Sequence, residues 1–330
     1  MRIRGIALTV CAFLTVGLMA TSASASNDAD FAKQWSLAKI GAPAAWAHTT
    51  GQGVRVGIVD TGVDLNHEDL AGKVVEGTNC IGAAGDPAKC KGSPQDDQGH
   101  GTHVAGIIAA NKDNGIGIAG VAPDAQLVVA KALSAKGEGS EDDINAGIKW
   151  VVDHGAKVVN LSLGDPNFVF TSLLGTGMRT GIEYAWSHGA VPVVAAGNSD
   201  LFGLGIGSSN YGNLDALVVG ATGPDDKVAS YSSPIGSAKW GILAPGGAGD
   251  GNKDHDIWST FWQQGKTNSY AALAGTSMAT PHVVGAVALL LAEGLTPQQA
   301  IDRLIKTADT KVACDHCSGR LDLAKATAPQ

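Results

Sequence analysis

The sequence contains few aromatic and charged residues and, beyond its first 20 positions, no long apolar run. Phe, Trp and Tyr make up 5% of the 330 residues and charged residues 16%, while 44% are hydrophobic. No later apolar run approaches the ~20 residues that span a bilayer, so we expect no membrane-spanning helix in the rest of the chain. Low-complexity tracts and internal repeats are also absent, which argues against disordered and fibrous classes and indicates a globular protein with a large core.

Positive charge is scarce as well. The chain has 23 basic and 31 acidic residues and a formal net charge of −8. The first 25 residues contain two arginines and no acid, so a chain without them would have 21 basic and 31 acidic residues and a charge of −10. Nucleic acids and anionic membranes attract basic surfaces, so we expect neither as a partner.

The N-terminal segment has the pattern of a secretory signal peptide. Arg2 and Arg4 precede an apolar stretch at 6–19, and Ala23-Ser-Ala25 forms a small-residue cleavage site. The alternative is a membrane anchor, but the apolar stretch is shorter than a membrane span. We therefore predict a signal peptide at 1–25 and a secreted, extracellular protein.

Cysteine is also rare, with five in the chain. Cys11 lies in the apolar stretch of the leader, and the remaining four form an even set, which in an exported chain indicates disulfides. Three connectivities are open, and we favour the local pairs Cys80–Cys90 and Cys314–Cys317. The alternative is zinc at Cys314-Asp-His-Cys317, although a structural zinc site normally needs a second ligand pair.

Strand-like and helix-like segments alternate along the chain. Short valine-rich runs predict buried parallel strands at 54–59, 127–133, 157–163, 191–196 and 216–221. Helix-like stretches follow at 100–110, 142–154, 173–188, 277–292 and 297–306. This alternation predicts an α/β fold, with a doubly wound, mostly parallel sheet and helices on both faces. No linker divides residues 26–330, so we expect a single domain there.

Asp60 ends the apolar run at 54–59 and is followed by Thr-Gly. A strand in this position would place the carboxylate at the carboxyl edge of the sheet, where open α/β folds bind ligands. Taken alone, an aspartate at a strand end is equally well explained as a turn or cap residue.

His100 opens a helix-like segment, His-Gly-Thr-His-Val-Ala-Gly. The small residues allow the start of the helix to pack closely, so that the imidazole can face the sheet edge. Metal binding by His100 and His103 is the less favoured alternative, since no third ligand lies in register.

Ser277 lies at the start of the long apolar helix-like segment, within Gly-Thr-Ser-Met-Ala-Thr-Pro. Pro281 is tolerated near a helix start, where amides lack partners. The positive helix end lowers the cost of nearby negative charge and suits a nucleophile, although a serine in this place is often only an N-cap.

Asn198 follows the apolar run Val-Val-Ala-Ala-Gly. An amide donates a hydrogen bond to an oxyanion without titrating. Alone, this segment is simply a turn.

Together the four segments resemble those of the subtilisin-like serine proteases in order, spacing and local sequence. The resemblance spans roughly residues 40–324, is closest to thermitase-like secreted members, and implies the three-layer α/β fold of that family. It implies a serine endopeptidase in which Asp60, His100 and Ser277 form the catalytic triad and Asn198 completes the oxyanion hole.

The resemblance also implies how substrate binds. An extended peptide or unfolded protein would add a strand to the segments at 131–139 and 161–164, and small residues would wall the primary pocket. The candidate substrate-binding residues are Lys131, Leu133, Gly137, Gly139, Ser162, Leu163, Gly164, Ala195, Ala196 and Gly197.

Four acidic residues lie where the family's pocket for more distant substrate residues begins. They are Glu138, Glu141, Asp142 and Asp143. They suggest a bias toward basic substrate residues, but a solvated helix start, where acidic residues favour the dipole, is the preferred explanation.

A structural calcium ion is the cofactor implied by the same resemblance, and no organic cofactor is expected. The loop after residue 110 matches the ion-binding loop of thermitase-like members in length. Its candidate ligands, with a carboxylate from an earlier segment, are Asp69, Asn111, Asn114, Ile116 and Ile118. An ordinary asparagine-glycine loop is the alternative.

The sequence departs from the family pattern in three places. Residues 35–46 already resemble the mature N-terminal region, so we expect no folding prosegment. Asp165 replaces an expected glycine, and the segment at 208–212 differs from the usual pocket wall. The preference for a substrate side chain should therefore not be copied from relatives.

The motifs thus predict a secreted monomeric serine endopeptidase that acts through an acyl-enzyme. A catalytically idle binding domain with the same fold is one alternative. An esterase or peptide ligase with the same triad is another, because acyl transfer does not fix the acceptor.

Overall fold

The structure of the chain is a computed structural model that describes residues 26–163, 177–198 and 211–329. Its seven-stranded sheet has the order β2-β3-β1-β4-β5-β6-β7, and every neighbouring pair is parallel. The strands are β1 (Arg55–Asp60), β2 (Val74–Asn79), β3 (Gln126–Lys131), β4 (Val158–Leu161), β5 (Val191–Ala195), β6 (Leu217–Thr222) and β7 (Trp240–Pro245). The expectation of a mostly parallel α/β sheet is confirmed.

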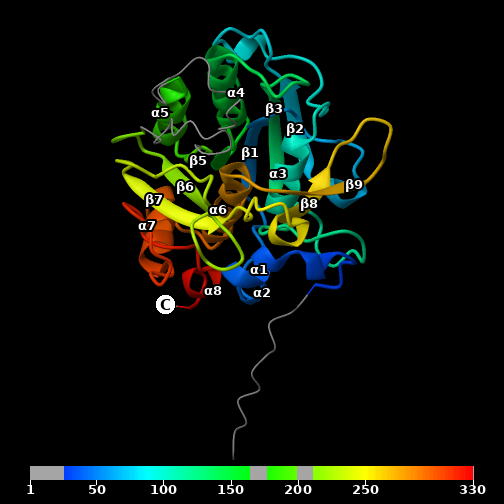
Figure 1. Ribbon diagram of the computed structural model, residues 1–330. Helices are drawn as coiled ribbons and strands as arrows, with labels where there is room; N and C mark the ends of the chain where they lie inside the picture. The colour runs from blue at the N-terminus through cyan, green and yellow to red at the C-terminus, as the bar shows by residue number, and fades with distance from the viewer. Residues whose placement is uncertain (1–25, 164–176, 199–210, 330) are drawn as a thin grey trace, which may run out of the picture.

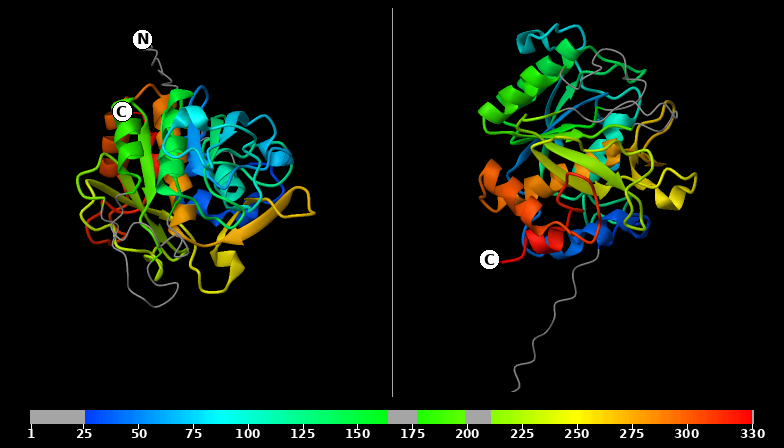
Figure 2. Two further views of the ribbon diagram at one scale, coloured as in Figure 1. Left: turned by 90° about the horizontal axis from the view of Figure 1, so that it is seen from above. Right: turned by 60° about the vertical axis from the view of Figure 1, so that its left-hand side comes forward.

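Helices cover both faces of this sheet (Figures 1 and 2). The longer helices are α3 (His100–Ala109), α4 (Glu141–Asp153), α5 (Arg179–Ser187), α6 (Thr276–Ala292) and α7 (Pro297–Thr307). The short ones are α1 (Trp35–Ile40), α2 (Ala42–Ala45) and α8 (Leu323–Ala326). Helices α4 and α5 pack on one face, and α3 and α6 on the other.

The sheet separates two hydrophobic cores because side chains alternate along each strand. In β1, Val56 and Ile58 belong to the core under α3 and α6, while Val59 belongs to the core under α4 and α5. All three side chains are fully buried. This burial on both faces explains why the central strands are continuous apolar runs.

The strand order reverses direction at β1. Its neighbours are β3 on one side and β4 on the other, and the chain reaches them by crossovers on opposite faces. Ligands of open α/β sheets bind at the carboxyl ends of strands next to such a switch point. Asp60, the last residue of β1, lies at this point.

A two-stranded antiparallel hairpin lies beside α3. It consists of β8 (Ile257–Phe261) and β9 (Ser269–Leu273), and its loop projects from the body of the molecule in Figure 1. The N-terminal segment holds it in place, because Trp258 Nε1 donates to Asp30 Oδ2 at 3.0 Å and Trp35 Nε1 donates to Asp256 O at 3.0 Å.

The structure confirms both expected disulfides, Cys80–Cys90 and Cys314–Cys317. The zinc alternative is wrong, because a sulfur in a disulfide has no thiolate to offer a metal. Near the second disulfide, buried Arg320 donates to Asp309 Oδ2 at 3.2 Å and to Lys39 O, and pairs with Asp226 at 2.8 Å. The C-terminal region is thereby joined to the first helix.

Within the described ranges, no helix combines the length and the apolar character needed to cross a bilayer. The leader predicted at 1–25 lies outside the described residues.

Candidate active site

Asp60 and His100 form a close pair at the carboxyl edge of the sheet. The fully buried Asp60 Oδ1 accepts a hydrogen bond from His100 Nδ1 at 2.8 Å and another from the Thr61 amide at 2.7 Å. Because a carboxylate only accepts, the imidazole proton lies on Nδ1, and the neutral ring has its lone pair on Nε2. Gly101 makes the approach feasible, since a Cβ there would collide with the Gly62 carbonyl.

Asp96, which sequence reasoning missed, fixes the loop that carries His100. Its Oδ1 accepts hydrogen bonds from the amides of Gln98 and Gly99, and its Oδ2 from the Thr102 amide, all at 3.0 Å. The Thr102 amide lies in the first turn of α3, where it has no partner within the helix, and the Gln98 and Gly99 amides lie in the loop just before it. An aspartate four residues before a helix was the available signal.

Ser277, the second residue of α6, is held by two reciprocal hydrogen bonds to Ser162. Its hydroxyl donates to Ser162 O at 3.2 Å, and the Ser162 hydroxyl donates to Ser277 O at 2.9 Å. Within a helix, Ser277 O would accept from the amide four residues later, but that residue is Pro281, which has no N–H. The proline therefore leaves this carbonyl to Ser162, whose hydroxyl also accepts from Asn160 Nδ2 at 3.0 Å.

Asn198 lies beside the start of α6. Its Oδ1 accepts hydrogen bonds from the amide and the hydroxyl of Thr276, both at 3.0 Å. Its Nδ2 is on the opposite side of the planar amide, 3.5 Å from where a Cβ of Gly275 would lie. The amide therefore presents a donor next to the first turn of α6.

His103 is a buried structural histidine. Its Nε2 lies 3.0 Å from Ala271 O and 3.1 Å from Ile257 O, so it joins α3 to the hairpin. Burial lowers the pKa of His103 to about 3, and the ring is neutral. Its Nε2 donates to these carbonyl groups and so has no lone pair for a metal. Among the described residues no group of three or more His, Cys, Asp or Glu side chains could hold a metal, which argues against a metal site on His100 and His103.

Most of the residues predicted to bind substrate lie at the same sheet edge as Asp60 and His100. After β3, Leu133 N donates to Asp60 O at 3.2 Å, and the chain turns back so that Ser134 N donates to Glu138 O at 2.8 Å. Gly137 has a φ of 76°, which this turn requires. Ser162 and Leu163 follow β4 at the same sheet edge, where Ala195 ends β5 and Ala196 and Gly197 follow it.

Gly164, Asp165 and the segment at 208–210 lie outside the described residues. Lys131 lies in the described part but not in a substrate groove, because its side chain is buried and bonded to protein groups. Its main chain pairs inside the sheet with both β1 and β2, so neither part is free to line a peptide groove.

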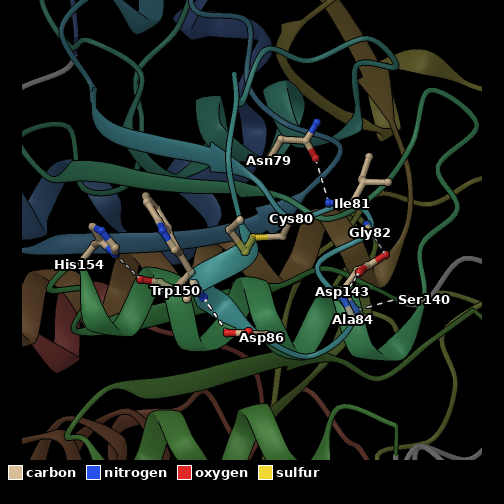
Figure 3. The surroundings of a disulfide bond; sticks show 12 residues. Asn79, Cys80, Ile81, Gly82, Ala84, Asp86, Ser140, Asp143, Trp150 and His154 are labelled. Carbon is tan, nitrogen blue, oxygen red and sulfur yellow. Dashed lines mark hydrogen bonds between the residues drawn. A yellow bond between two sulfur atoms is a disulfide. The ribbon is translucent and has the colours of Figure 1, made fainter.

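Asp143 also differs from the expected acidic rim. Its carboxylate is buried and accepts hydrogen bonds from the amides of Gly82 and Ala84, both at 3.0 Å, in the loop closed by Cys80–Cys90 (Figure 3). Burial opposes the charged form, but these bonds outweigh it and hold the pKa of Asp143 below its usual value. Asp143 therefore anchors the disulfide loop.

The residues predicted to bind calcium lie together. Asp69 is fully buried; its Oδ1 accepts from Asn114 Nδ2 at 2.9 Å and its Oδ2 from Ile118 N at 2.8 Å. Asn111 N donates to Asp69 O at 2.9 Å, and Ile116 N to Asn114 Oδ1 at 2.9 Å. Burial raises the pKa of Asp69, so its charged form is destabilised in this environment.

Asp28, in the N-terminal segment, is a second carboxylate that contacts the same loop, and the sequence did not reveal it. It is buried; its Oδ1 accepts from Asn114 N at 2.9 Å and its Oδ2 from Asp113 N at 3.0 Å. An acidic residue near the N-terminus is too common to indicate a site. In the part of the chain that the structure describes, no group of three or more His, Cys, Asp or Glu side chains could hold a metal, so an ion here would depend on amide and carbonyl oxygens as well.

The chain was compared with known families and proteins. Residues 51–321 match the model of the subtilase family, Peptidase_S8. Thermitase of Thermoactinomyces vulgaris is 38% identical over 286 residues, which is 86% of this chain and 91% of the relative. Subtilisin Savinase of Lederbergia lenta is 40% identical over 259 residues, which is 78% of this chain and 83% of the relative.

A solved structure described as one of the proteases of Pseudoalteromonas arctica has a similar fold. Its TM-score is 0.76 at 29% sequence identity, and the match covers 92% of this chain and 99% of that one. Its fold agrees with the parallel sheet found here. The chain thus belongs to the subtilase family and is a serine-type endopeptidase.

Proposed function

We propose that this chain is a secreted endopeptidase in which Ser277 is the nucleophile, His100 the general base and acid, and Asp60 the residue that orients and stabilises the imidazole. The observation that carries this proposal is the 2.8 Å bond between Asp60 Oδ1 and His100 Nδ1. A proton held on Nδ1 by this bond makes Nε2 the ring nitrogen that would act as the general base.

The first step transfers a proton from Ser277 to His100. A hydroxyl has one proton, and in the resting structure it points to Ser162 O, so it must turn away before His100 Nε2 can take it. Oγ then bonds to the scissile carbonyl carbon. His100 becomes positively charged next to the Asp60 carboxylate, which stabilises it.

The negative charge that develops on the carbonyl oxygen meets two donors, Asn198 Nδ2 and the main-chain amide of Ser277. Both are neutral groups near the first turn of α6, where the helix dipole also favours negative charge. His100 next gives its proton to the leaving amine, and an acyl-enzyme remains. Water activated by His100 completes hydrolysis by the reverse sequence.

Extended peptides and unfolded proteins are the proposed substrates of a monomeric enzyme formed by residues 26–330. The segment at 133–139 and the residues after β4 would pair with the peptide main chain. Main-chain pairing is independent of side chains, so the selectivity would come from the pocket beside Ala195, Ala196 and Gly197. Their small side chains leave room for a bulky substrate residue.

We propose calcium as a structural ion at Asp69. A buried carboxylate and the carbonyls of the loop at 111–118 are oxygen ligands of the kind that a hard cation takes. Asn114 directs its Nδ2 at Asp69 in this structure, so its amide would have to turn to present Oδ1 to the ion. An adjacent cation would also favour the charged form of Asp69, which burial opposes. The ion would stabilise the fold and take no part in the reaction.

Hydrolysis of denatured casein by the purified chain without residues 1–25 tests the triad. We expect cleavage that is abolished by a serine-directed phosphonate and by Ser277→Ala. Ser187→Ala is the matched control, because that serine is exposed at the end of α5 and its hydroxyl bonds only to Tyr184 O and His188 Nδ1 among the described contacts. A folded wild-type chain that cleaves neither casein nor peptide amides would disprove the proposal.

A further inference from the structure

The ammonium group of Lys131 lies buried between three segments that carry the proposed active site. Lys131 ends β3, pairs in register with Asp60 of β1, and is only 4% exposed. Its Nζ lies 2.6 Å from Thr61 O, 2.6 Å from Asp97 Oδ1 and 2.9 Å from Leu133 O. An ammonium has three N–H donors, so these three acceptors use all of them.

Each acceptor belongs to a different part of the site. Thr61 follows Asp60, and its amide donates to the Asp60 carboxylate that orients His100. Asp97 lies three residues before His100, in the loop that positions the imidazole. Leu133 begins the segment proposed to pair with the peptide. A shift of the ammonium would therefore displace the triad and the peptide segment relative to one another.

The two carbonyl contacts are the ones that the fold cannot replace. Thr61 and Leu133 are buried, and their oxygens carry partial negative charges that converge on one point. Without a cation between them they would repel and lack donors, and an unsatisfied buried carbonyl is costly. The Asp97 side chain is 47% exposed, so water can replace Lys131 there, and that ion pair contributes little.

We propose that Lys131 is a positioning residue of this enzyme, which fixes the distance between the Asp60–His100 pair and the peptide-binding segment through Thr61 O and Leu133 O. The inference rests on the proposed function, since it assumes that triad. It assigns a role to a residue whose side chain is too buried to touch a substrate.

Lys131→Met tests this role, because methionine keeps the length and apolar stem of the side chain but has no N–H. The phosphonate counts active sites, and turnover of a peptide amide is then measured per titrated site. A misplacement of about 1 Å can lower turnover by about 10²-fold. We expect a loss of this order in kcat, with a smaller change in KM and a normal fraction of titrated sites.

Lys73→Met is the matched control. Lys73 is also buried and donates to a carbonyl, that of Pro123, but it lies just before β2, at the opposite end of the sheet. Lys73→Met should keep wild-type turnover per site. Asp97→Asn should lose far less turnover than Lys131→Met, since it leaves the carbonyl contacts intact.

Two outcomes would overturn the proposal. One is wild-type kcat per titrated site in Lys131→Met, which would make Lys131 purely structural. The other is a loss in Asp97→Asn as large as that in Lys131→Met. If Lys131→Met does not fold, Lys131→Arg is the substitute variant. The planar guanidinium of arginine cannot direct its N–H groups from one point to all three acceptors, so wild-type turnover per titrated site in Lys131→Arg would also overturn the proposal. An inactive wild type would instead refute the triad.

Discussion

Replacing Ser162 by alanine tests how Ser277, the proposed nucleophile, is held. The Ser162 hydroxyl donates a hydrogen bond to the Ser277 carbonyl, which Pro281 leaves without an amide partner. The same hydroxyl also accepts a hydrogen bond from Asn160 Nδ2. Alanine removes both contacts. Each buried group left unsatisfied costs about 1–3 kcal/mol, so we expect Ser162→Ala to lower the free energy of unfolding by about 2–4 kcal/mol.

The proline provides a sharper form of the same test. In Pro281→Ala the new amide can donate to Ser277 O within α6, so the carbonyl no longer depends on Ser162. Ser162→Ala should then cost about 1–2 kcal/mol less in the Pro281→Ala protein than in the parent. The difference is the coupling energy between the two positions.

Urea unfolding followed by tryptophan fluorescence measures these energies. All variants are made with Ser277→Ala, which prevents self-cleavage and keeps the main-chain carbonyl at 277. An equal cost of Ser162→Ala in both proteins, and therefore no coupling, would refute the idea that Ser162 replaces the missing helix bond.

Three further predictions concern stability. Burial lowers the pKa of His282 to about 4, below that of an unfolded histidine near 6.5, so its contribution to stability is present above pH 6.5 and is lost as the pH falls toward 4. Unfolding titrations should show a pH dependence that is weaker in His282→Gln by about 1.4 kcal/mol per pH unit in that window; parallel curves would contradict it. Removing the Cys80–Cys90 disulfide with Cys80→Ala and Cys90→Ala should lower the free energy of unfolding by about 2–3 kcal/mol, measured by the same urea titration. An unchanged free energy would show that the contacts of Asp143 hold the loop without the disulfide. Arg320→Met leaves the Asp226 and Asp309 carboxylates near Lys39 without their buried cation, and we expect a loss of about 3–5 kcal/mol; a calorimetric midpoint equal to wild type would exclude a structural role for this cluster.

The central strands and the main helices could be predicted from the sequence because their patterns are local. All five predicted strands are present with ends shifted by at most two residues, and α6 and α7 are within one residue of the predicted helices. The sequence missed β2, β7, β8 and β9. Strand β2 is a half-exposed edge strand with Glu76 and Gly77, so it has no continuous apolar run.

The disulfides agree with the preference for local pairs among three possible connectivities, and the residues around Asp69 were proposed from the family resemblance. By contrast, Asp143 was assigned to the substrate rim because its place at a helix start does not tell which way its carboxylate points. Its partners are some 60 residues earlier in the chain. Only the packing of the disulfide loop against α4 brings them together.

The sequence by itself identified Asp60, His100, Asn198 and Ser277 as candidates for the proposed chemistry, because their four motifs occur together in the order and spacing of the subtilases. Taken alone, the motifs of Asp60, Asn198 and Ser277 are equally well explained as turns or caps. It also determined the effect of Pro281, which acts within its own helix by offering no N–H to Ser277 O. The need for glycine at 101 came from the tertiary structure, because a Cβ there would collide with the Gly62 carbonyl of another segment. The tertiary structure alone decided the contacts between segments, such as Ser162 with Ser277 and Lys131 with Thr61. Such contacts depend on which strands become neighbours, and side chains far apart in the sequence meet only when the sheet has formed.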